Sequence, residues 1–301
     1  MQSPLQRTLP AGAFCDLVTP FRNGAIDTEA LANLVKWQIR SGISGIVVCG
    51  EAGEATSLTR DERAAVIRCA IETAGDQLPV IAGTGTNATA STIDLTTDAA
   101  QLGAAAAVIV TPYYNKPSQE GIFRHYEQIA AAVNIPIVIC NAPARTASDL
   151  APRTLERLAT IAGIVGLQDC TGDLGRLALI PPGLKNRFRQ YSGHDLTAFS
   201  FNLAGGAGSF SVAANIAPRF VSAMHDALRT GNLDAAITLN ARVNPILQVL
   251  EREPGPATVK QALAILRDLD PELRLPLTPI APETAAALRT ALVSLSNADQ
   301  R

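Results

Sequence analysis

Two stretches in the middle of the chain, IPIVICNAPART (residues 135–146) and GIVGLQDCTGDL (residues 163–174), carry the pattern that decides the fold. Each stretch begins with a run of aliphatic residues and ends in polar ones, and a segment long enough for a helix separates them. Because side chains alternate across a strand, the three isoleucines of the first stretch share one face, which suits a layer of helices. The same alternation turns Cys140 and Gln168 toward the opposite, inner face.

Runs of this kind recur along the first two-thirds of the chain, and helical periodicity lies between most of them. With roughly 25 to 30 residues for each strand and helix, the alternation predicts a (β/α)8 barrel. A doubly wound parallel sheet uses the same alternation and is the rival, but no strand-then-glycine nucleotide fingerprint is present. The eight runs are 12–17, 43–49, 79–83, 105–110, 135–140, 164–168, 188–191 and 208–212.

After residue 215 the periodicity is entirely helical. The first helix completes the barrel, so we expect a barrel over residues 1–230 and a C-terminal helical domain over residues 231–301. The four expected helices are 217–230, 232–251, 256–268 and 281–296.

Earlier in the chain, Thr59 and Glu62 have the spacing of a capping box at the start of a helix that Gly75 ends. Ser118 is a candidate N-cap for another helix.

Composition excludes several classes of function. The chain has 301 residues, a net charge of −2 and 47% hydrophobic residues, which is typical of a globular protein with a large core. No basic stripe, apolar 18-residue run or secretory signal is present, so we expect no nucleic-acid or membrane partner. The five cysteines show no CxxC spacing and the three histidines are scattered, which favours a cytoplasmic protein with reduced thiols and without metal or cofactor.

Residues with chemical potential follow several predicted strands, which is where barrel active sites lie. Glu51 follows the second run and is either a base or a carboxylate that ends a helix or joins an ion pair. Tyr114 follows the fourth run, where a phenol can pass a proton; the alternative is that Tyr113 or Tyr114 packs against a neighbouring subunit. Arg145 follows the fifth run and is either a carboxylate clamp or part of a surface ion pair.

Together these segments resemble the dihydrodipicolinate synthase/N-acetylneuraminate lyase superfamily of class I aldolases. The resemblance covers nearly the whole chain and implies a barrel with a C-terminal helical domain, a tetramer, and pyruvate or a related 2-oxo acid as substrate. The similar segments are CGEAGE with SLTRDE, GTGTN at 83–87, VTPYYNKPSQEG at 110–121, NAPART at 141–146, TGDL at 171–174, SGHD at 192–195, GGAGSFSVAAN at 205–215 and LRLPLTPI at 273–280.

The catalytic positions of the family differ in this chain. The family's strand-six lysine, whose amine forms an iminium with pyruvate, corresponds to Gln168, and an amide nitrogen is neither basic nor usefully nucleophilic. The family's strand-five tyrosine corresponds to Cys140, and two threonines of its GTTGE segment correspond to Glu51 and Ala52. The resemblance therefore implies a member that lacks the Schiff-base lysine.

Other positions match the family. Tyr114 corresponds to a tyrosine of the proton relay, and Arg145 corresponds to the carboxylate clamp. By the same resemblance, we assign Ala52, Gly193 and Phe210 to substrate binding.

Three hypotheses about function follow. The first is a pseudoenzyme or ligand-binding protein that holds a small carboxylate or 2-oxo acid without Schiff-base chemistry. The second is an enzyme with altered chemistry, in which Glu51 is the base, Cys140 the nucleophile or acid, and Tyr114 the proton donor. The third is a pyruvate lyase that recruits another lysine, which needs a positioned, deprotonated amine. We expect a homo-oligomer, a dimer or tetramer, with Tyr113 near the subunit interface.

Overall fold

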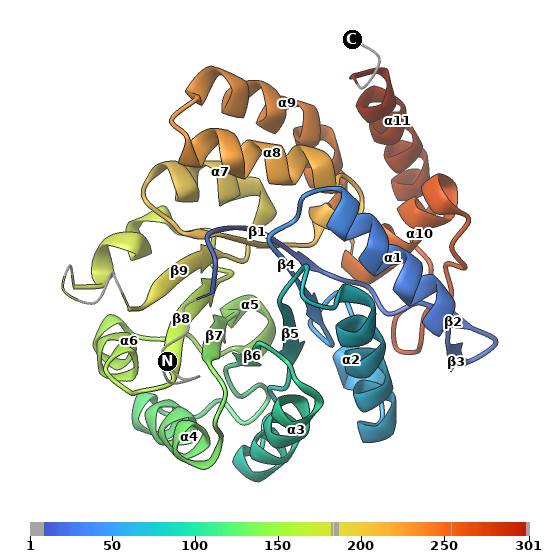
Figure 1. Cartoon of the computed structure of the whole chain (residues 1–301). Coiled ribbons are helices and arrows are strands. Elements are labelled where there is room, and N and C mark those ends of the chain that lie inside the picture. The colour runs from blue at the N-terminus through green and yellow to red at the C-terminus, as the bar shows by residue number, and fades with distance from the viewer. Residues whose placement is uncertain (1–8, 182, 184–186, 254, 299–301) are drawn as a thin grey trace. The chain divides into compact units, whose positions relative to one another are not determined.

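The computed structural model describes residues 9–181, 183, 187–253 and 255–298 (Figure 1). Within this part of the chain, eight strands form a closed barrel in the order β1-β10-β9-β8-β7-β6-β5-β4. This confirms the predicted (β/α)8 barrel and excludes the open, doubly wound sheet. The barrel strands are β1 (Gly12–Asp16), β4 (Gly45–Val48), β5 (Val80–Gly83), β6 (Ala106–Val110), β7 (Ile137–Asn141), β8 (Ile164–Asp169), β9 (Arg189–Ser192) and β10 (Gly208–Ser211).

The chain divides into two compact units. The first comprises the described residues of Met1–Ala11 together with Pro79–Phe210, and the second comprises Gly12–Leu78 together with the described residues of Ser211–Arg301. The expected division into a barrel over residues 1–230 and a helical domain over residues 231–301 stays a prediction.

The first unit places helices outside its parallel strands. In Figure 1, α3, α4 and α6 flank β6, β7 and β8 on their outer side. The alternation of strand and helix seen in the sequence is therefore present in this unit. Its helices are α3 (Thr89–Leu102), α4 (Gln119–Ala132), α5 (Pro143–Thr146), α6 (Pro152–Ala159), the 3-10 helix η3 (Leu174–Leu179) and α7 (Asp195–Leu203).

The core of the first unit follows the expected alternation of side chains. Ile137 and Ile139 of β7 and Leu167 of β8 are fully buried, and they share one cluster with Tyr126 of α4 and Leu158 of α6. Burying an aliphatic side chain of this size stabilises the folded state by about 1.5–3 kcal/mol. The prediction that the isoleucine face of β7 meets the helix layer is confirmed.

The second unit combines β1 and β4 with helices from both ends of the chain. Helix α9 packs against both α8 and α11, and α1 packs against α2. The four helices expected after residue 215 are all present. The remaining elements of the unit are β2 (Phe21–Arg22), β3 (Ala25–Ile26), α1 (Thr28–Arg40), η2 (Ala55–Ser57), α2 (Arg60–Ala74), η5 (Ala213–Asn215), α8 (Pro218–Arg229), α9 (Leu233–Leu250), α10 (Gly255–Arg267) and α11 (Pro282–Ala298).

The predicted helix caps are formed. The Thr59 side chain accepts the Glu62 N–H, and the Glu62 carboxylate accepts the Thr59 N–H at 2.9 Å, which is the capping box at the start of α2. Gly75 ends the same helix with a positive φ of 52°. The Ser118 hydroxyl accepts the Gly121 N–H at 3.2 Å at the start of α4. No helix in the described ranges is long and apolar enough to cross a membrane.

Candidate functional site

The ends of β7 and β8 bring Cys140 and Gln168 together in the first unit. The two residues are direct partners in the parallel pairing of these strands, and both side chains are half-buried. No hydrogen bond to another described residue is recorded for the Gln168 amide, which is open enough to be solvated or to meet a ligand. A thiol and an amide are therefore adjacent at the ends of neighbouring strands.

Cys170 joins this pair, and the sequence interpretation missed it. It directly follows β8, its N–H donates to the Asn141 carbonyl at 2.9 Å, and its Sγ lies 3.9 Å from the Cys140 Sγ. A signal was available, because Cys170 lies two residues after Gln168, on the same side of an extended chain.

Gly193 leaves the room that these side chains occupy. A Cβ at this position would overlap the Cys170 Sγ and would lie 2.9 Å from the Gln168 Cγ. Gly193 therefore belongs to the cluster, and its part there is to make space. We call Cys140, Gln168, Cys170 and Gly193 the thiol–amide cluster.

A network of charges holds the strand ends that carry the cluster. Arg176 donates from Nε to the Asp169 carboxylate at 3.0 Å, and a second nitrogen lies 3.0 Å from Asp149. Asp149 in turn accepts from the Asn141 side chain at 2.8 Å. The Asp169 and Arg176 side chains are 3% and 12% exposed, so this ion pair is shielded from solvent and screened less than a surface pair. The network restrains the ends of β7 and β8 and the segment between residues 141 and 150.

Arg145 lies within that restrained segment, in the short helix α5, and its side chain is exposed. A guanidinium can bind a carboxylate with two parallel hydrogen bonds, and the assignment of Arg145 as a carboxylate clamp stays a prediction.

Tyr114 lies away from the cluster. Its side chain is 93% exposed and its φ is +68°, a conformation that non-glycine residues adopt infrequently. Within the described residues, no hydrogen bond joins it to Cys140 or Gln168, and its part in the relay of the second hypothesis stays a prediction. Tyr113 is half-buried beside it, and its place near a subunit interface stays a prediction.

Phe210 lies inside the first unit. It is 2% exposed, and its ring lies 5.2 Å from that of Tyr191, the residue paired with Gln168 across β8 and β9. The Tyr191 hydroxyl donates to the Leu9 and Pro10 carbonyls, and burial raises its pKa above the ordinary value. The Phe210 ring therefore packs against Tyr191, and its assignment to substrate binding stays a prediction.

The second unit holds Glu51 and Ala52 in the loop after β4. Glu51 is exposed, whereas Ala52 is fully buried and its N–H donates to the Asp16 carboxylate at 3.2 Å. The neighbouring Glu54 is 4% exposed and forms an ion pair with Lys260 of α10, with Nζ and Oε1 2.5 Å apart. We call the segment 50–58 the acidic loop.

None of the lysines in the described part of the chain lies on a barrel strand. Lys36 and Lys116 are exposed on α1 and in the loop after β6, and Lys260 is fully buried in its ion pair with Glu54. Lys185 lies outside the described residues. The third hypothesis therefore finds no positioned amine among the described lysines.

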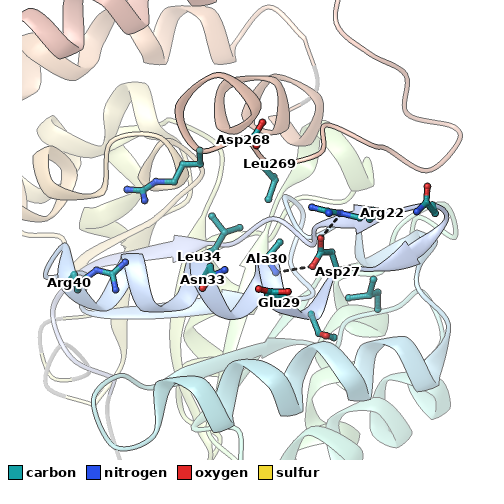
Figure 2. Close-up of a pocket in the computed structure, with 13 residues that line it drawn as sticks. Arg22, Asp27, Glu29, Ala30, Asn33, Leu34, Arg40, Asp268 and Leu269 are labelled. Atoms are coloured by element: carbon teal, nitrogen blue, oxygen red, sulfur yellow. Dashed lines mark hydrogen bonds and ion pairs between the residues drawn. The ribbon is translucent and has the colours of Figure 1, made fainter.

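A pocket of about 730 Å³ lies elsewhere in the second unit, along α1 and the end of α10 (Figure 2). Two of the charged residues that line the pocket form an ion pair, since Arg22 Nε lies 2.9 Å from the Asp27 carboxylate. Asp27 also accepts the Ala30 N–H as the N-cap of α1. No predicted site residue lines it, so its size does not make it the site of the expected chemistry.

Side chains that could ligate a metal ion do not cluster in the described part of the chain. Among the described residues, no three His, Cys, Asp or Glu side chains converge where an ion could be bound. His194 precedes α7 and its Nδ1 lies 3.0 Å from the Thr197 hydroxyl, which fits a local structural role. Cys49 is fully buried, and burial raises its pKa to about 12, so it stays a thiol.

Comparison with known proteins gives a consistent result. The profile of the dihydrodipicolinate synthetase family matches residues 9–295. The 4-hydroxy-tetrahydrodipicolinate synthase of Thiobacillus denitrificans is 44% identical over 282 residues, which cover 93% of this chain and 95% of that protein. The corresponding enzyme of Parvibaculum lavamentivorans is 42% identical over 287 residues, with coverages of 95% and 98%.

Solved structures agree with the sequence relatives. The chloride-inhibited dihydrodipicolinate synthase of Acinetobacter baumannii, complexed with pyruvate, superposes with a TM-score of 0.92 at 41% identity and covers 96% of this chain and 99% of its own. Sequence and fold thus match over almost the full length, and this chain belongs to the dihydrodipicolinate synthetase family.

Proposed function

We propose that this chain binds a small carboxylate or 2-oxo acid at the thiol–amide cluster and does not form a Schiff base with it. The observation that carries the proposal is Gln168, whose half-buried amide stands at the end of β8 beside Cys140. An amide nitrogen shares its lone pair with the carbonyl, so it can orient a ligand by hydrogen bonds but cannot add to a ketone as an amine does.

The choice of ligand class rests on two supports. The Acinetobacter baumannii relative is described as complexed with pyruvate, a small 2-oxo acid. In this chain the exposed Arg145 guanidinium follows β7, where it can meet the carboxylate of such a molecule. The Gln168 amide offers two N–H donors and a carbonyl acceptor to the rest of the ligand.

A test of the covalent step uses pyruvate, sodium borohydride and intact-mass measurement. The wild-type chain is expected to show no added mass, because no iminium forms. The matched variant Gln168→Lys restores an amine at the same position and is expected to retain a borohydride-trapped pyruvate. An adduct on the wild-type chain would overturn the proposal.

A test of binding uses calorimetric titration with pyruvate and with a panel of small mono- and dicarboxylates. At least one of them is expected to bind, and Arg145→Ala is expected to weaken it about tenfold or more, since a charge-assisted hydrogen bond contributes about 1.5–3 kcal/mol. Arg145→Lys should recover part of the loss, and Arg229→Ala, an exposed arginine on α8, should leave binding unchanged. Absence of binding by every member of the panel would refute the ligand class.

We also propose a cytoplasmic homo-oligomer. All five cysteines are unbridged, which fits a reducing compartment. The 93% exposed Tyr114 and the adjacent Tyr113 are the candidate interface residues, because tyrosine is enriched where protein surfaces meet. Light scattering after size exclusion is expected to give a dimer or tetramer, and Tyr114→Ser should shift it toward the monomer. A monomeric wild-type chain would contradict the proposal.

A further inference from the structure

Two thiols from neighbouring strand ends touch in the first unit. The Cys140 Sγ and the Cys170 Sγ are 3.9 Å apart, although the residues are separated by 30 positions in the chain. Both residues are only half-buried, so the pair is not sealed inside the core. The two sulfurs are therefore close to each other on residues that are partly exposed.

The backbone beneath the two thiols is held in place by the surrounding contacts. Asn141 and Asp169 are direct partners across β7 and β8, and the Cys170 N–H donates to the Asn141 carbonyl at 2.9 Å. The ion pair between Asp169 and Arg176 restrains the same strand ends. The strand pairing thus fixes the backbone at both cysteines, and their side chains reach toward each other from it.

The other cysteines lack this arrangement. Cys15 and Cys49 are buried in the second unit, and burial raises the pKa of Cys49 to about 12. Cys69 is half-buried, and its sulfur donates to the Thr28 carbonyl oxygen at 3.4 Å. Cys69 therefore provides a single thiol of comparable exposure with which the pair can be compared.

From this geometry we infer a redox-sensitive dithiol: Cys140 and Cys170 are a modification site that low-molecular-weight disulfides convert to an intramolecular disulfide. Two thiols with no converging third ligand suit disulfide exchange better than a structural metal, which takes four ligands. The inference does not depend on the proposed ligand, since it concerns the protein's own sulfurs.

The reaction balances in two exchange steps. One of the two cysteines, as the thiolate, attacks a sulfur of the small disulfide; the small S–S bond breaks, one small thiolate leaves, and a mixed disulfide remains on the protein. The second cysteine, as the thiolate, then attacks the protein sulfur of that mixed disulfide, forms the Cys140–Cys170 bond and releases the second small thiolate. The two leaving thiolates take up the two protons, so the protein is oxidised by two electrons and one small disulfide is reduced to two thiols.

The experiment exposes the reduced full-length chain to oxidised glutathione and stops the exchange with acid. Intact mass is expected to show the loss of two hydrogen atoms without retained glutathione. Tryptic cleavage after Arg145, Arg153 and Arg157 separates the two cysteines, so a linked peptide pair identifies the bridge directly in the wild-type chain. Addition of dithiothreitol should reverse both signals.

Three variants decide how the pair reacts. Cys140→Ser and Cys170→Ser should each stop at the mixed disulfide and retain one glutathione on the remaining thiol, whereas Cys69→Ser should still form the bridge. Circular dichroism checks that each variant is folded, and the wild-type peptide map does not depend on any of them. A wild-type chain that gains glutathione at separate cysteines without a bridge, that bridges other cysteines, or that does not react would overturn the inference.

Discussion

Replacing Lys260 by methionine tests the buried ion pair between α10 and the acidic loop. The lysine is fully buried, its Nζ lies 2.5 Å from Glu54 Oε1, and it also donates to the Glu272 carbonyl at 2.8 Å. Its ammonium lies 4.0 Å from the centre of the Phe21 ring. Burial lowers the pKa of Lys260 while Glu54 opposes the shift, so the charge of the lysine is tied to that of its partner. Methionine keeps most of the aliphatic chain and removes the charge.

The expected loss of stability for Lys260→Met is about 3–5 kcal/mol, because it leaves the Glu54 carboxylate buried without its counter-ion. The double variant Lys260→Met/Glu54→Gln removes that unpaired charge. The double variant is still expected to be less stable than the wild type by about 1–3 kcal/mol, because its buried amide has incomplete hydrogen bonds. The second substitution is therefore expected to recover stability that the first one loses.

Urea unfolding followed by tryptophan fluorescence measures these differences. The chain has one tryptophan, Trp37 of α1, which belongs to the same unit as Lys260 and Glu54. Lys36→Met, an exposed lysine on α1, is the matched control and should change stability by no more than about 0.5 kcal/mol. The reasoning fails if Lys260→Met lowers the free energy of unfolding by less than about 1 kcal/mol. It also fails if Glu54→Gln destabilises the Lys260→Met variant as much as it destabilises the wild-type chain.

Three further predictions concern stability, each measured as a urea midpoint. Gly193→Ala should lower the free energy of unfolding by about 1–3 kcal/mol, because the added methyl group overpacks the cluster. In a Cys170→Ala background, which lacks the nearest atom, the same substitution should lower it clearly less. Equal losses in the two backgrounds would contradict the close contact. The hydrogen bond from Arg274 lowers the Glu62 pKa from 4.5 to about 2. The ionised Glu62 therefore stabilises the folded state fully above pH 4.5, and this contribution is lost as the pH falls toward 2. The advantage of wild type over Glu62→Gln should shrink across that window, and a constant difference would count against the pair. Burial lowers the His125 pKa from 6.5 to about 4, so the unfolded chain binds an extra proton between these values and stability falls as the solution is acidified; His125→Gln should flatten this dependence.

The fold could be predicted from local pattern because most barrel strands, such as β4 and β6, are short aliphatic runs with helical periodicity beside them. The isoleucine face of β7 reaches the helix layer as period-two alternation requires, whereas the pairing of Cys140 with Gln168 depends on the register between β7 and β8. The helix caps at Thr59 and Ser118 could be predicted because each cap hydrogen bond joins residues three positions apart in the sequence.

The parts that sequence could not supply depend on tertiary approach. Tyr114 is exposed and has a positive φ in the loop after β6, and its residue type signals neither feature. The partner of Lys260 is far away in the chain, so periodicity describes the helix α10 but not the carboxylate that its lysine meets. The contact between Cys140 and Cys170 could be predicted only in part. The sequence indicates that Cys170 shares a face with Gln168, but it does not give the distance between the two sulfurs.

The reach of the C-terminal segment into the acidic loop has a consequence for synthesis on the ribosome. Arg274 binds Glu62 across 212 positions, and Lys260 meets Glu54 from the same late segment. The residues that begin the second unit therefore emerge long before their counter-charges exist, while residues 79–210 are translated as one uninterrupted piece. A nascent chain halted at residue 230 would carry Glu54 without its partner, so the second unit must complete its assembly after the last helices leave the exit tunnel.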